Sequence, residues 1–303
     1  GSVNAPGLEP ITETMRLWQL FAHTSGLTYG FMYNHPVDEL YRRAGFEWGS
    51  PAGCDLEGVC DVLAALPLLF QPGSEWSYSM GLDVLGRVLE VVGGQPLDEL
   101  MRTRLLEPLG MHETTWHVPE ANHSRLATLY GAHPTTRQAV LLEPMGQLAK
   151  QPPAFLGGGG GLQSTAYDYH RFTQMLVNGG ELDGARILSP RTVRYMASNH
   201  LPGNVDLTAF GRPLFSETAF DGVGFGLGVS LERLFSDRIG IEARGFHARL
   251  RDEFEIGANG IGITAALVAP VFSVKKSVFT TTQVVSLSTT FAGGQIRYTT
   301  NGT

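Results

Sequence analysis

The sequence predicts an α+β fold, in which a helical body is followed by a β-rich C-terminal segment. Between residues 16 and 200, apolar side chains recur every three or four positions in several segments, the spacing of amphipathic helices. From about residue 222 the pattern becomes strand-like, and residues 270–303 are rich in Val, Thr and Ser with period-two stretches. We place the change near residue 230.

Composition limits the classes of function. With 303 residues, 43% hydrophobic and 17% charged, the chain is long and apolar enough for a sizeable core. Its net charge of −7 and the lack of a basic run argue against nucleic-acid binding. No apolar stretch reaches the length of a membrane span, and no signal peptide is visible. Gly1-Ser2 has the form of a cloning remnant, and the sequence indicates no compartment.

Cysteines and histidines give little sign of a metal or cofactor site. Cys54 and Cys60 are expected as free or half-buried thiols, although a disulfide closing a short loop stays open. The nine histidines are scattered without ligand-like spacing, so we expect surface or core roles for them. No cofactor is therefore expected.

The helical body divides at Pro and Gly residues. Asp55, Ser164 or Thr165, and Ser189 are candidate N-caps, and Gly93-Gly94 has the form of a C-cap. Residues 117–150 are expected to be irregular with short strand-like runs. The predicted helices cover residues 16–23, a short stretch near 37–44, 55–70, the segment from Pro72-Gly73 to Gly93-Gly94, 96–111, the segment from 164 or 165 to 178, and a short stretch from 189.

Tyr78 stands out because it lies in polar company just before a long helical pattern, in "QPGSEWSYSMG" (residues 71–81). Its spacing alone favours a packing role at the start of the helix. A tyrosine in this position is also able to serve as a base if nearby positive charge lowers its pKa. The choice depends on the surrounding segments.

Three segments carry a family resemblance, and they occur in the right order. They are "LWQLFAHTSGL" (residues 17–27), the stretch from "FQPGSEWSYSMG" to "GMHETTW" (70–116), and the stretch from "GGGGGLQST" to "YMASNH" (157–200). Together they resemble the serine β-lactamase-like hydrolases, which include class C β-lactamases, D-alanyl-D-alanine carboxypeptidases and β-lactamase-fold esterases. The resemblance covers roughly residues 9–230 and implies a partial β-lactamase or penicillin-binding-protein-like fold.

The resemblance implies that Tyr78 is the catalytic tyrosine. In this family that residue acts with a lysine to take the proton of a nucleophilic serine, since a serine hydroxyl is otherwise a poor nucleophile. Met80 stands where many members have asparagine, which suits the esterase-type members better than true β-lactamases. The implied ligand is a small ester, amide or β-lactam-like molecule.

Two catalytic elements of the family are not found at the expected places. No Ser-x-x-Lys precedes His23, and no Lys-Thr-Gly, Trp-Gly-Gly or His-x-Gly follows residue 230. We therefore expect a chain that lacks both ends of the catalytic domain. The one Ser-x-x-Lys, Ser273 to Lys276, is a minor alternative through circular permutation, because it lies in a β-like run after Pro270 rather than at a helix start.

The C-terminal residues resemble a different module. "PVFS", "VSLST" and "IRYTTNGT", within residues 270–303, are similar to the small immunoglobulin-like β domain at the C-terminus of chitobiase and hexosaminidase-type proteins. This resemblance implies an accessory, non-catalytic β module. The expected domains are a truncated hydrolase domain over 1–230, an unassigned connector over 231–268, and a partial immunoglobulin-like module over 269–303.

Other candidates have simpler interpretations. Ser25 is expected to shape a turn, and Gly157–Gly161 lacks the sequel of a phosphate loop, so a tight turn near the cleft is its expected role. The glycines at 224–228 are not followed by a helix and do not make a dinucleotide fingerprint. Asp83 and Glu90 are expected on solvated faces of the long helix.

Function is expected to follow the family but with impaired chemistry. The first hypothesis is an esterase-like serine hydrolase with an acyl-enzyme mechanism, with little activity because losing one member of such a unit removes most of the rate. The alternative is a non-catalytic fused or truncated scaffold or binding protein that keeps the cleft. Unpaired strands would also favour a homo-oligomer.

Overall fold

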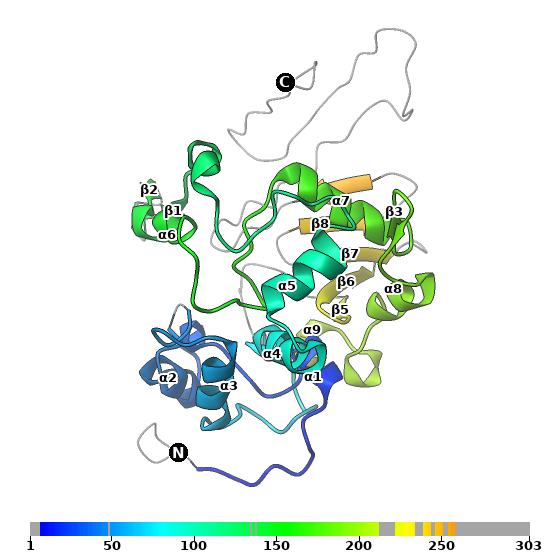
Figure 1. Ribbon diagram of the computed structural model, residues 1–303. Helices are drawn as coiled ribbons and strands as arrows, with labels where there is room; N and C mark the ends of the chain where they lie inside the picture. Colours follow the sequence, from blue (N-terminus) through cyan, green and yellow to red (C-terminus); the bar gives the residue numbers. More distant parts are fainter. Residues whose placement is uncertain are drawn as a thin grey trace, which may run out of the picture.

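The computed structural model describes residues 7–47, 49–133, 135–136, 138–211, 222–233, 239–243, 246–250 and 254–257, and these residues define the fold. Figure 1 shows helices filling most of the molecule, with an antiparallel sheet to one side. Of the described residues, none belongs to a helix long and apolar enough to cross a membrane. The predicted β module over 269–303 lies outside the described residues.

Helices occupy most of the chain from residue 17 to residue 210. Short 3₁₀ turns cover Gly30–Met32, Glu120–Arg125 and Pro202–Asn204, and a π-helical turn covers Arg102–Leu106. The α-helices are α1 (Leu17–Phe21), α2 (Pro36–Arg43), α3 (Leu56–Ala64), α4 (Gly81–Gly93), α5 (Leu97–Met101), α6 (Glu143–Leu148), α7 (Ala166–Val177), α8 (Pro190–Met196) and α9 (Leu207–Phe210).

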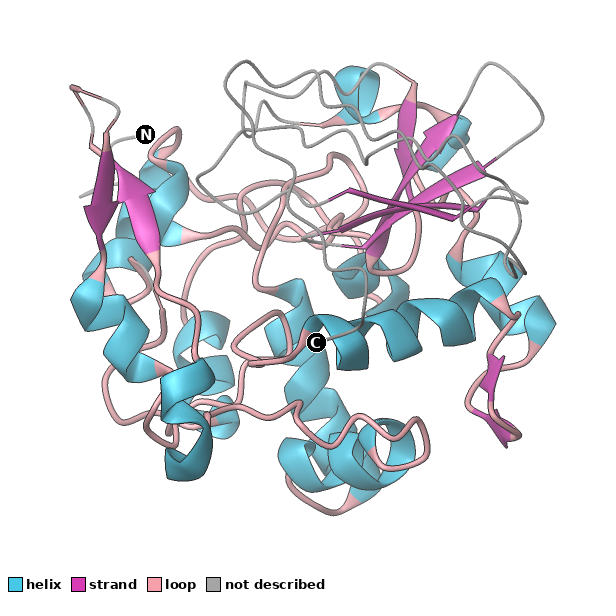
Figure 2. Ribbon diagram, turned by 90° about the horizontal axis from the view of Figure 1, so that it is seen from above, coloured by secondary structure: helices cyan, strands magenta, loops and turns pink. Residues whose placement is uncertain are grey.

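The strands form two hairpins and one larger sheet in the described part of the chain. One hairpin pairs β1 (Tyr130–Ala132) with β2 (Ala139–Leu141), and the other pairs β3 (Glu181–Leu182) with β4 (Ala185–Arg186). The larger sheet is an antiparallel meander of β5 (Val223–Phe225), β6 (Val229–Arg233), β7 (Ile239–Ala243), β8 (Phe246–Leu250) and β9 (Phe254–Gly257). Helices with antiparallel sheet confirm the predicted α+β class. Figures 1 and 2 place the β1–β2 hairpin on one side of the molecule and the larger sheet on the other.

Local sequence signals explain the helix ends. The side chains of Asp55, Thr165 and Ser189 each accept a hydrogen bond from a backbone N–H in the first turn, which confirms them as N-caps. Gly94 ends α4 in the left-handed conformation with φ of 66°, as a C-cap glycine does. The helix predicted over 55–70 stops at Ala64, because Pro67 follows and the residue before a proline avoids helical backbone.

The interior is organised around α4. Buried residues of α2 and α3 pack with Met80, just before α4, in one apolar cluster. A second cluster joins Trp76 and Tyr78 to Leu201, Leu207 and Phe225, and so connects the segment before α4 to the first strand of the larger sheet. The start of α4 therefore lies between the helical body and the sheet.

Candidate active site

The backbone before α4 brings the first resembling segment against the second. The N–H of Ser77 donates to the carbonyl oxygen of His23 at 3.0 Å, and the N–H of Gly73 donates to that of Thr24 at 2.7 Å. Gly81, the first residue of α4, lies so close to α1 that a Cβ there would be 2.6 Å from the carbonyl oxygen of Leu20. Only glycine permits this approach, and it fixes where Tyr78 stands.

His23 is hydrogen-bonded to Ser79, the residue after Tyr78. The ring is 2% exposed, and its Nδ1 lies 3.2 Å from the backbone nitrogen and 3.0 Å from the Oγ of Ser79. A backbone N–H can only donate, so Nδ1 is an acceptor and the ring proton is on Nε2. His23 has a φ of 56°, a conformation uncommon for a residue with a side chain. The neutral imidazole is thus held by Ser79.

Aromatic rings surround Tyr78, which is 6% exposed. Its ring centroid lies 4.7 Å from that of His23 and 5.0 Å from that of Tyr29. Tyr29 stacks in turn on Phe31 at 4.7 Å with an interplanar angle of 19°. Offset and tilted pairs at these distances add to the stability gained by burial alone. Tyr78 is consequently fixed by rings from one other segment of the chain, residues 23–31.

The glycine turn of the third segment lies against the same helix start. A Cβ on Gly158 would be 2.2 Å from the carbonyl oxygen of Leu82, so the turn contacts the α4 backbone directly. Asp83 is 5% exposed, and its carboxylate accepts a hydrogen bond from the N–H of Gly159 at 3.0 Å. Burial raises the pKa of Asp83, although the hydrogen bonds from the turn oppose this. Gly157–Gly161 is the tight turn that was expected.

Two predictions for the long helix are wrong. Asp83 was expected on a solvated face, but it is buried beneath the glycine turn. The side chain of Glu90 is 15% exposed, pairs with Arg87, and accepts a hydrogen bond from the N–H of Leu97 at 3.1 Å. Both carboxylates fix chain segments that pack onto α4, a role that helical periodicity does not reveal.

Other predicted residues have simple placements. Ser25 is fully buried, and its Oγ accepts a hydrogen bond from the N–H of Leu27 at 3.4 Å, consistent with shaping a turn. Cys54 and Cys60 are free thiols of intermediate exposure, as expected. Ser273 and Lys276 lie outside the described residues. Within the described residues, no three His, Cys, Asp or Glu side chains form a group able to hold a metal ion.

Sequence reasoning missed His23, Tyr29 and Phe31 as neighbours of Tyr78. The segment "HTSGLTYGF" contains all three of them. The buried histidine directly before a Thr-Ser-Gly turn was the available signal.

Comparison with known proteins shows the family of the chain. The Beta-lactamase family model matches residues 6–248, and the chain belongs to this family of β-lactamase-fold serine hydrolases and acyltransferases. Protein Rv1367c of Mycobacterium tuberculosis (strain ATCC 25618 / H37Rv) is 36% identical over 223 residues, which are 73% of this chain and 52% of that protein. The lovastatin esterase of Penicillium rubens (strain ATCC 28089 / DSM 1075 / NRRL 1951 / Wisconsin 54-1255) is 30% identical over 199 residues, 65% of this chain and 46% of the esterase.

Solved structures share the fold. EstCE1, a hydrolase with promiscuous acyltransferase activity, has a TM-score of 0.59 and 25% sequence identity, covering 78% of this chain and 63% of its own. The LovD6 mutant of simvastatin synthase from Aspergillus terreus has a TM-score of 0.63 and 20% identity, covering 81% and 59%. The chain spans about half the length of the two curated relatives, Rv1367c and the lovastatin esterase.

Proposed function

We propose that Tyr78 is the proton acceptor of an acyl-transfer site of the esterase type. The observation that carries the proposal is the meeting of three distant segments at the start of α4. His23 fixes Ser79 beside Tyr78, and Asp83 fixes the glycine turn at Gly159. A proton-transfer residue must be held within hydrogen-bond reach of its partner, and these contacts fix the backbone that follows Tyr78.

The proposed chemistry is transfer of an acyl group through a serine ester. Deprotonated Tyr78 takes the proton of a serine hydroxyl while the serine oxygen forms a bond to the carbonyl carbon of the substrate. The tetrahedral intermediate collapses, the bond to the leaving alkoxide breaks, and the tyrosine returns the proton to that alkoxide. Water or another alcohol then takes the acyl group in the same two steps.

The surroundings of Tyr78 favour ester substrates with apolar groups. The tyrosine is bordered by the ring of Tyr29, which stacks in turn on Phe31. Met80 is 3% exposed and packs in the core of the helical body, so this position offers no amide group to a substrate. The names of the lovastatin esterase and of esterase EstB from Burkholderia gladioli, which is 39% identical over 110 residues, support the same substrate class.

We further propose that the 303-residue chain does not turn over esters by itself. Of its three lysines, Lys150 is the one in the described part, and it lies beyond β2 rather than among the neighbours of Tyr78. A tyrosine base needs a nearby cation, and the described serines include no Ser-x-x-Lys. The chain alone would then act as a binding protein that keeps the aromatic site.

The experiment compares the chain as it stands with a completed enzyme. The 303-residue chain is assayed with p-nitrophenyl butanoate and labelled with a fluorophosphonate, followed by peptide mass mapping. We expect no turnover and no labelled serine in a folded protein. Turnover with label on Ser273 would instead support the permuted alternative with Lys276 as its partner.

The completed enzyme tests Tyr78 directly. A Ser-x-x-Lys helix segment from an esterase of this family is fused before residue 1, and variants with measurable turnover are kept. Tyr78→Phe should lower kcat by about a hundredfold or more. The matched control is Tyr195→Phe, since Tyr195 is 60% exposed on α8 and should leave kcat unchanged. Equal activity of Tyr78→Phe and the parent would refute the assignment.

A further inference from the structure

Residues 118–150 form an excursion that closes on itself and is joined to the preceding chain by the ion pair of Arg125 with Glu113. The N–H of Val118 donates to the carbonyl oxygen of Ala149 at 2.7 Å, which joins the two ends of the excursion. Within it, β1 pairs with β2, the N–H of Leu142 donates to the carbonyl oxygen of Leu129 at 2.9 Å, and α6 follows. Figures 1 and 2 show the hairpin and α6 together at the edge of the molecule.

A pocket of about 90 Å³ lies inside this excursion, and all its lining residues fall between 123 and 150. It shares no residue with the neighbours of Tyr78, so it is separate from the candidate active site. One wall is apolar and consists of Leu126, Leu129, Leu141 and Leu142. Leu129 and Leu141 are 42% and 48% exposed, so this wall is open to solvent. Several leucines grouped around an open pocket are a candidate ligand surface.

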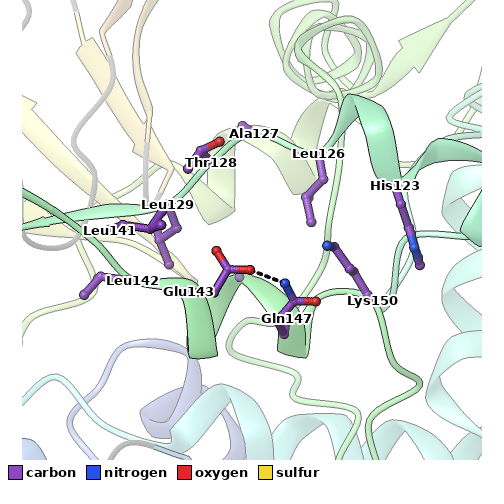
Figure 3. Close-up of a pocket in the computed structure, with 11 residues that line it drawn as sticks. His123, Leu126, Ala127, Thr128, Leu129, Leu141, Leu142, Glu143, Gln147 and Lys150 are labelled. Carbon is purple, nitrogen blue, oxygen red and sulfur yellow. Dashed lines mark hydrogen bonds between the residues drawn. The ribbon is translucent and has the colours of Figure 1, made fainter.

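The polar side of the pocket contains an ammonium group that has no ion pair among the described residues. Glu143 accepts a hydrogen bond from the side chain of Gln147, and the Nε2 of His123 bonds to the carbonyl oxygen of Val118. The ion pairs among the described residues do not include Lys150, whose side chain extends towards the centre of the pocket and ends near Leu126 and Gln147 (Figure 3). The positive charge of Lys150 is therefore available to an anion.

Glu143 also lines the pocket, and its carboxylate accepts the hydrogen bond from the side chain of Gln147. An anionic head group would therefore contact the ammonium group of Lys150, and the rest of the ligand would lie along the leucines. The small volume excludes bulky ring systems, which need pockets of a few hundred Å³.

We propose that this pocket binds a small aliphatic monocarboxylate, with its carboxylate on Lys150 and its alkyl chain on Leu126, Leu129, Leu141 and Leu142. Charge complementarity selects the head group, and the open leucine wall selects an unbranched chain of modest length. The proposal concerns reversible binding and does not depend on the function of Tyr78. Affinity on the order of 1 mM is expected for so small a ligand.

The test measures hexanoate binding to the whole chain by saturation-transfer NMR and by chemical-shift titration. Hexanoate should bind, whereas hexylammonium and acetate should bind at least tenfold more weakly, because each lacks one half of the recognition. Lys150→Gln should weaken hexanoate about tenfold, and Lys150→Arg should retain most of the affinity. Leu129→Asn, at an exposed position, should also weaken hexanoate but not the residual binding of acetate.

The matched control is Arg194→Gln, which removes the same charge at an exposed position on α8, outside the pocket lining, and should leave hexanoate affinity unchanged. Melting temperatures of all variants confirm that each is folded. Equal affinity of Lys150→Gln and the parent would overturn the proposal, as would hexylammonium binding as well as hexanoate. A titration with no binding up to tens of millimolar, about tenfold above the expected Kd, would overturn it too.

Discussion

A double-mutant cycle on His23 and Ser79 tests how Tyr78 is held. Ser79 is fully buried, and Ser79→Ala removes the Oγ that lies 3.0 Å from Nδ1 of His23. The backbone N–H of residue 79 still donates to Nδ1 at 3.2 Å, so the ring keeps one partner. The free energy of unfolding should therefore fall by about 1 kcal/mol, the net value of one hydrogen bond. The melting temperature should fall by about 3 °C.

His23→Ala is expected to cost more. It removes a ring that contacts Trp76, Tyr78 and Phe225 at centroid distances of 6.1, 4.7 and 5.3 Å. It also leaves the N–H and hydroxyl of Ser79 without their acceptor in a buried place. Loss of a buried ring costs about 4 kcal/mol, as in other large-to-small core substitutions.

The double variant decides whether the hydrogen bond is real. Ser79→Ala in the His23→Ala background should cost clearly less than alone, with a coupling energy of about 1 kcal/mol. The long bond from the N–H of Gly81 to the Oγ of Ser79, at 3.4 Å, is lost in both backgrounds and cancels. Urea unfolding followed by tryptophan fluorescence and circular dichroism gives the four free energies. Additive costs within about 0.3 kcal/mol would refute the reasoning.

Three further predictions follow from the residues around α4. Gly158→Ala should lower the free energy of unfolding by more than about 2 kcal/mol, because the added Cβ would clash with the carbonyl oxygen of Leu82. The control is Gly160→Ala, whose Cβ would have no atom within 4 Å, and it should change the free energy of unfolding in urea by less than about 1 kcal/mol. Because burial raises the pKa of Asp83 above its unfolded value of about 3.9, its contribution to stability is present below that pH and is lost as pH rises through the folded-state pKa. The stability of the parent relative to Asp83→Asn should therefore fall as the pH rises above about 4 in urea unfolding, and a constant difference would contradict this. Burial raises the pKa of Cys60 to about 11, so its alkylation by iodoacetamide at pH 8, followed by mass mapping, should be much slower than that of a free thiol in solution, and equal rates would contradict the burial.

Local sequence signals were sufficient for most of the helices. Asp55, Ser189 and Gly94 specify helix ends through their own side chains or backbone freedom, and the structure confirms each of them. Such signals act over three or four residues, so they can be recognised without knowing the fold. The helix α6 was not predicted, because its six residues contain Pro144 and Gly146 and show no apolar period.

Contacts between distant segments could not be derived in the same way. Asp83 follows the periodicity of an exposed helix position, but the glycine turn that covers it comes 76 residues later. The resemblance to a family supplied the importance of Tyr78, whereas the ring of His23 and the bond to Ser79 required coordinates. The catalytic role of Tyr78 and the missing nucleophile remain predictions.

The closure between Val118 and Ala149 has a consequence for how this protein can diversify. A segment whose two ends meet at one backbone hydrogen bond behaves as an exchangeable cassette, since its length and sequence can change while the flanking chain keeps its path. Natural variants or engineered libraries could therefore replace residues 119–148 without altering the helix that follows Tyr78. The start of α4 would then stay unchanged while residues 119–148, at the edge of the molecule, change in sequence and bind other ligands.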